Sequence, residues 1–145
     1  MTITSAVCNS FKTEALGGIH DLDTDVIKIA LIKASESGTY GASTTNYSTL
    51  TGNSDEASGT NYTAGGNTLS GASISLSTNT AIVDFSDTAW LSATISANGA
   101  LIYNSSKSDR AIAVLSFGGT VTSTAGDFTI QFPAAAADTA IIRLV

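Results

Sequence analysis

The sequence predicts a mainly β fold: an antiparallel β-sandwich or jelly roll with one short N-terminal helix and one long polar loop. Its 145 residues fit one domain of ordinary size. Charged residues make up 12% of the chain, against a usual share of roughly a quarter. Ser, Thr and Gly fill much of the difference, which favours strands and turns over helices. Short apolar segments also recur between turns, as in antiparallel β domains. We therefore expect a single β-rich domain over residues 1–145.

The helix is predicted at residues 6–16, where apolar residues recur at three-to-four-residue spacing. Ser5 is the predicted N-cap, and Gly17 is expected to end the helix. A polar turn at 20–25 follows. Residues 26–34 then predict a well-buried strand, because they are mostly apolar and rich in β-branched side chains.

Residues 35–71 are the predicted long loop or arm, with Ser, Gly, Thr and Asn in excess and aliphatic residues scarce. A loop of this length inside a domain is usually functional or partly disordered. Residues 59–66 read GTNYTAGG, whose glycines can adopt the positive φ that tight turns require. We therefore expect an ordered excursion.

The second half of the chain predicts regular short strands. They are expected at residues 72–77, 80–85, 100–104, 111–117, 128–132 and 140–144. The expected core consists of Ile82, Trp90, Leu101, Tyr103, Val114, Phe117, Phe128, Ile130 and Phe132. The last apolar strand has to be paired or covered, in its own sheet or by a neighbour.

Charge and hydropathy bound the partners. A net charge of −6 argues against binding a nucleic acid, which requires clustered Lys and Arg. No apolar run approaches the roughly 20 residues of a membrane span, and no signal-peptide pattern begins the chain. We expect a protein made in a cytoplasm, with neither nucleic acid nor membrane as partner.

Few residues could support catalysis or bind a cofactor. The single cysteine, Cys8, lies in an apolar stretch that favours a buried side chain over a nucleophile. The single histidine, His20, lies in the charged turn, and one Cys with one His cannot supply a zinc site. A Gly-rich phosphate loop is also missing, because no Lys follows Gly65 and Gly66. The expectation is a protein without enzymatic activity, cofactor or metal.

Two acidic groups are candidate cation or catalytic sites. Asp21, Asp23 and Asp25 alternate as calcium ligands can, but Val26 and Ile32 occupy the positions where an EF-hand loop has Gly and Glu. A solvated turn is favoured, and cation binding there stays open. A second group, with a small hydrolase as the corresponding function, consists of Asp84, Asp87 and Asp127.

Aromatic residues are the candidate partner-binding residues. Tyr40, Tyr47 and Tyr62 are spaced through the long loop, and Phe11 lies in the N-terminal segment. Tyrosine offers a large face with a polar tip, and interfaces are enriched in it. These side chains are expected to contact a partner protein. The alternatives are stacking on carbohydrate, or anchoring of the loop to its own domain.

Several motifs resemble a family of small tailed-bacteriophage virion structural proteins. They are NSFKTEALGGIHDL at 9–22, TDVIKIAL at 24–31, GTNYTAGGNTL at 59–69 and GDFTI at 126–130, together with the Trp90 region and ALIY at 100–103. The resemblance spans nearly the whole chain.

The resemblance implies a virion component, and it favours a capsid decoration or cement protein on the outer surface of the major capsid lattice. The expected partners are the major capsid protein and further copies of the chain, with a trimer as the assumed homo-oligomer. The alternative within the same context is a tail-fibre or head-fibre module that recognises a host by binding surface glycan.

Overall fold

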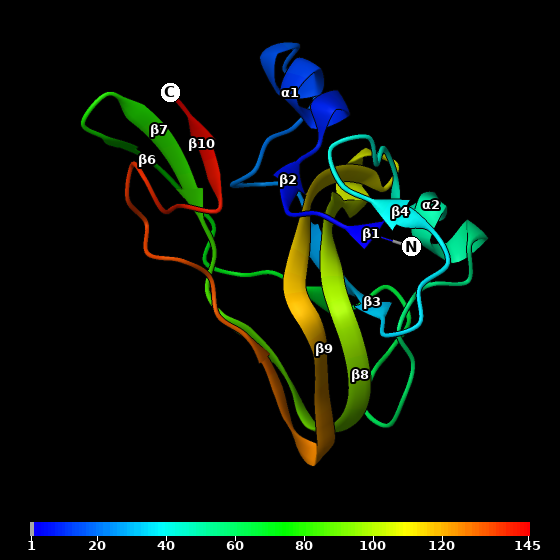
Figure 1. Ribbon diagram of the computed structural model, residues 1–145. Helices are drawn as coiled ribbons and strands as arrows, with labels where there is room; N and C mark the ends of the chain where they lie inside the picture. The colour runs from blue at the N-terminus through cyan, green and yellow to red at the C-terminus, as the bar shows by residue number, and fades with distance from the viewer. Residues whose placement is uncertain (1) are drawn as a thin grey trace.

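The computed structural model describes residues 2–145 and contains two antiparallel sheets (Figure 1). Strand makes up 48% of the chain and helix 12%, so the predicted mainly β class with a short N-terminal helix is confirmed. The larger sheet has the strand order β2-β9-β8-β3-β5. Its members are β2 (Ala6–Val7), β9 (Arg110–Ile130), β8 (Thr88–Asn104), β3 (Ile27–Lys33) and β5 (Asn67–Thr68).

The long strands β8 and β9 form a bent ribbon. They run side by side and turn back together at the lower end of Figure 1. At this bend Ser92 and Ala125 have φ of 49° and 48°, and the register shifts between Trp90 and Ala93. Such irregularities bend a strand pair and increase its twist. Because of the bend, the β8–β9 hairpin belongs to the larger sheet at one end and extends toward the smaller sheet at the other.

The separate strands predicted at 100–104, 111–117 and 128–132 are parts of this ribbon, so those boundaries are wrong. The intervening residues 118–127 are mostly exposed Gly, Ser and Thr and lack the alternating apolar pattern. Pairing with β8 makes them a strand. A strand exposed on both faces leaves no hydrophobic periodicity from which to predict it.

The smaller sheet has the order β10-β7-β6, with β10 (Ile142–Leu144), β7 (Thr80–Asp84) and β6 (Ser73–Ser77). It confirms the strands predicted at 72–77, 80–85 and 140–144, with shorter limits. Directly paired residues share a face of a sheet. One face therefore carries two aliphatic rows, Ile142-Val83-Ile74 and Leu144-Ala81-Leu76.

The predicted N-terminal helix is α1, which spans Asn9–Leu16 and begins three residues later than expected. The N-cap is Cys8 and not Ser5, whose hydroxyl instead accepts a hydrogen bond from the Ser116 N–H. Residues 6 and 7 pair with β9 as β2, and this pairing prevents them from joining the helix. Gly17 ends α1 as predicted.

The segment 35–71, predicted as one long loop or arm, contains regular secondary structure. It contains β4 (Thr39–Tyr40), α2 (Tyr47–Gly52) and β5. β4 pairs in parallel with β1 (Thr2–Ile3). A 3-10 turn, η1 (Ser105–Lys107), lies in the connection between β8 and β9.

The core is formed around β3 and the second half of β8. The surrounding elements bury both faces of these strands. Of the predicted core residues, all are buried except Phe117 and Phe132, which are half-buried and pack against the same cluster. Cys8 is fully buried, as predicted, and burial raises the pKa of its thiol to about 11. Its thiol is therefore protonated at neutral pH.

Candidate functional site

Asp55 is a fully buried carboxylate at the centre of the segment 35–71. It accepts hydrogen bonds from the Tyr40 hydroxyl at 2.7 Å and from the backbone N–H groups of Ser37 and Gly38 at 2.9 and 2.8 Å. The Lys33 ammonium lies 3.4 Å from Asp55 Oδ1. These contacts tie the start of the segment to its middle.

The pKa values of this group follow from its surroundings. Burial alone would raise the pKa of Asp55, but the hydrogen bonds from Tyr40, Ser37 and Gly38 outweigh burial and hold the pKa well below its usual range. Burial and the Asp55 carboxylate raise the pKa of Tyr40 to about 12. At neutral pH the pair is a carboxylate and a phenol.

Glu56 organises the second half of the segment. Its carboxylate accepts hydrogen bonds from the Tyr47 hydroxyl at 2.5 Å, the Tyr62 hydroxyl at 2.8 Å and the Gly65 N–H at 2.6 Å. Tyr62 also accepts a hydrogen bond from the Leu31 N–H of β3. Burial, followed by the Glu56 charge, raises the pKa of both tyrosines.

The aromatic residues predicted to bind a partner are used inside the chain. Tyr40 is fully buried and Phe11 is nearly so. The ring of Tyr47 stacks on Tyr103 with a centroid distance of 4.6 Å, and Tyr62 packs on Trp90 at 5.7 Å.

The contacts of these tyrosines fit the alternative that they anchor the segment to its own domain. Tyr40 has no exposed surface to offer a partner. The residues that sequence reasoning missed are Asp55 and Glu56. An adjacent acidic pair in a segment with almost no other charge was the available signal.

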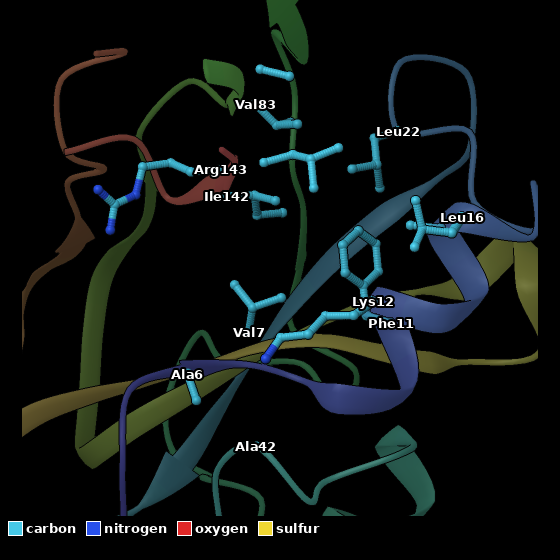
Figure 2. Close-up of a pocket in the computed structure, with 13 residues that line it drawn as sticks. Ala6, Val7, Phe11, Lys12, Leu16, Leu22, Ala42, Val83, Ile142 and Arg143 are labelled. Atoms are coloured by element: carbon cyan, nitrogen blue, oxygen red, sulfur yellow. The ribbon is translucent and has the colours of Figure 1, made fainter. Parts of the chain in front are cut away.

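An open apolar groove lies between α1 and the smaller sheet, with a volume of about 670 Å³. Figure 2 shows Phe11, Leu16 and Leu22 on one side of it, with Val83 and Ile142 across from them. The only charged side chains in its lining are Lys12 and Arg143, and both are basic. The groove therefore suits an apolar segment flanked by acidic groups.

The rim of this groove exposes aliphatic side chains. Leu16 is 80% exposed, and Leu144 at the end of β10 is 64% exposed. On the same sheet face, Ile74 and Leu76 of β6 are 52% and 71% exposed. Exposed apolar residues that cluster in this way are typical of interaction surfaces.

His20 lies in a polar cluster beneath α1. Its side chain is 1% exposed, with Nε2 3.6 Å from Glu14 Oε1 and Nδ1 3.0 Å from the Asn104 amide nitrogen. Glu14 also pairs with Arg110. The cluster links α1 to the connection between β8 and β9, and this packing accounts for the burial of His20.

Three of the acidic candidates, Asp25, Asp87 and Asp127, accept hydrogen bonds within the chain. Asp25 accepts from the Asn104 side chain at 2.7 Å and from the Asp21 N–H at 3.0 Å. Asp87 accepts from the Phe132 N–H, and Asp127 from the Ser92 N–H at the ribbon bend. Within residues 2–145, no group of three or more His, Cys, Asp or Glu side chains is placed to hold a metal ion.

The chain was also compared with known proteins. No family model, no curated protein and no solved structure matches it. The resemblance to tailed-phage virion proteins therefore stays a prediction. No helix within residues 2–145 has the length and apolar character needed to cross a membrane.

Proposed function

We propose that this chain is a structural protein of a tailed-phage particle, a capsid decoration protein that binds the outer surface of the major capsid lattice through the groove between α1 and the smaller sheet. The observation that carries the proposal is the groove itself, with its exposed aliphatic rim. A free chain gains nothing from leaving this surface in water, so an assembly that covers it is favoured.

The expected occupant of the groove is an apolar segment of the major capsid protein with acidic residues beside it. The apolar part would bury the rim, and Lys12 and Arg143 would meet the acidic part. Repeated copies on a lattice add their contacts, so each single contact can be modest.

The fibre alternative was suggested by the tyrosines of the segment 35–71, and their positions do not favour it. A tyrosine that stacks on glycan needs an exposed ring, whereas Tyr40 is buried and Tyr47 and Tyr62 pack on Tyr103 and Trp90. We therefore put forward the capsid role alone.

Copy number tests the proposal most directly. We expect quantitative mass spectrometry of purified particles to give a simple ratio of this chain to the major capsid protein, because a decoration protein follows the lattice. A few dozen copies or fewer would place the chain in the tail or fibres. Its absence from the particle would refute the structural role.

The substitution Leu16→Glu tests the groove. Leu16 is 80% exposed, so the change should leave the free energy of unfolding within about 0.5 kcal/mol of the parent. A charge at the apolar rim should weaken binding to particles that lack the protein by about 10-fold to 100-fold, the effect of losing an interface anchor of ~1.4 to 2.8 kcal/mol. Co-sedimentation with such particles measures the affinity.

The matched control for Leu16→Glu is Leu91→Glu. Leu91 is 64% exposed at the ribbon bend and does not line the groove. Equal weakening by both substitutions, or by neither, would show that the groove is not the capsid-binding surface.

A further inference from the structure

The strand β6 presents an unprotected sheet edge. It pairs with β7 on one side, and no strand within residues 2–145 pairs with its other side. Natural proteins usually protect such edges with charges, Pro or a bulge. β6 has regular pairing and the sequence SISLS, and residues 57–83 contain no charged side chain at all. The edge is thus open to a further strand.

The backbone groups available at this edge follow from the hairpin geometry. Ser77 pairs with Thr80 across the two-residue loop Thr78–Asn79, in which Thr78 has φ of 56°. A two-residue loop is closed by a hydrogen-bonded pair, and such pairs alternate along an antiparallel ladder. Ser73, Ser75 and Ser77 therefore bond to β7. The N–H and C=O groups of Ile74 and Leu76 point to the free edge.

The strand is nearly symmetric about Ser75, since Ser-Ile precedes it and Leu-Ser follows it. A two-fold axis through Ser75 places Ile74 opposite Leu76 of a second copy, and Leu76 opposite Ile74. These are the residues whose backbone groups are free, so the register forms four hydrogen bonds between the copies. We propose that β6 pairs antiparallel with β6 of a second copy about this axis, so that the two smaller sheets become one six-stranded sheet.

The side chains support the same pairing. Ser73, Ser75 and Ser77 of β6 are uncharged. Two chains of net charge −6 can therefore approach along this edge without like charges facing each other. On the other face, Ile74 and Leu76, which are 52% and 71% exposed in one copy, would cover each other across the axis. A C2 interface needs this kind of self-complementary surface.

The inference is independent of the capsid role and differs from the trimer expected from the sequence. In such a dimer both aliphatic faces lie on the same side of the joined sheet, because the two-fold axis stands perpendicular to it. The two grooves would then open on one side of the dimer. A dimer of this form could hold two identical partner segments at once.

The test is disulfide crosslinking of the Ser75→Cys variant. In a non-hydrogen-bonded antiparallel pair the Cα atoms are about 4.5 Å apart, within the range of about 4.4 to 6.8 Å that a disulfide spans. Cys8 is buried and does not compete. We expect mild oxidation to convert most of the Ser75→Cys chain into a covalent dimer with an unchanged circular dichroism spectrum.

Two further variants fix the register. Residues 73 and 77 face each other across the proposed axis, while two copies of either residue lie about 13 Å apart along the strands. Ser73→Cys and Ser77→Cys should therefore each stay monomeric on non-reducing gels, and a mixture of the two should crosslink. Analytical ultracentrifugation of the unsubstituted chain should give twice 14.6 kDa. A monomer or trimer there, or crosslinking of Ser75→Cys no greater than that of Ser77→Cys alone, would overturn the proposal.

Discussion

The substitution Asp55→Asn is expected to lower the free energy of unfolding by about 3 to 5 kcal/mol. This is the effect of removing one charged partner from a buried ionic group. The carboxylate accepts from Tyr40, Ser37 and Gly38 and lies beside Lys33. An amide has one acceptor oxygen and turns an NH₂ group toward donors. Several buried donors would then be unsatisfied. Urea denaturation measures the loss.

The matched control is Asp138→Asn, because Asp138 is exposed. It should change the free energy of unfolding by no more than about 0.5 kcal/mol. The pH dependence provides a second readout. A folded-state pKa below the unfolded value of about 3.9 gives stability that is present above pH ~4 and lost as the pH falls below it. The parent chain should lose more stability in acid than Asp55→Asn, which lacks the contribution of this carboxyl. Identical acid slopes would contradict the assignment.

The substitution Gly66→Ala is expected to lower the free energy of unfolding by about 2 to 5 kcal/mol. Gly66 has φ of 74°, where an L-residue costs roughly 1 to 2 kcal/mol. An added Cβ would also lie 1.8 Å from the Ile29 carbonyl oxygen of β3. Relieving this overlap must displace β5 from β3 and adds a cost of about 1 to 3 kcal/mol. Thermal and urea unfolding measure the sum.

Gly118→Ala separates the two contributions to this effect. Gly118 has φ of 76°, but an added Cβ there would meet nothing within 4 Å. The control should therefore show the backbone cost alone. Equal losses for Gly66→Ala and Gly118→Ala would mean that the close approach of residue 66 to β3 is unimportant.

Local patterns predicted the local elements. The apolar run at 26–34, the helical spacing before Gly17 and the two short strands around Thr78–Asn79 each carry their own signal, and the structure contains all of them. The ribbon was divided in the prediction because its exposed middle has no apolar periodicity. Asp55 and Glu56 stand out in sequence as an acidic pair in a nearly uncharged segment, but their partners do not, since the hydrogen-bond donors lie up to 18 residues away along the chain.

The groove could not be predicted from any local sequence pattern. Phe11 and Leu16 come from the start of the chain, Val83 from its middle and Ile142 from its last strand. Each is an ordinary core-type residue in sequence. The pairing of β10 with β7 places Ile142 beside Val83, and α1 lies across an open space from them. Long-range pairing of this kind leaves no spacing to recognise.

The position of β10 near the end of the chain also determines when the groove can be completed during synthesis. Every other described element precedes β10, and Ile142 must return to Val83 to complete one wall of the groove. The β8–β9 ribbon closes across a short connection and can form early, whereas this return closes a long loop. A nascent or truncated chain therefore lacks the finished surface. Under the proposed decoration role, binding through the groove would require a chain that has been translated and folded through β10.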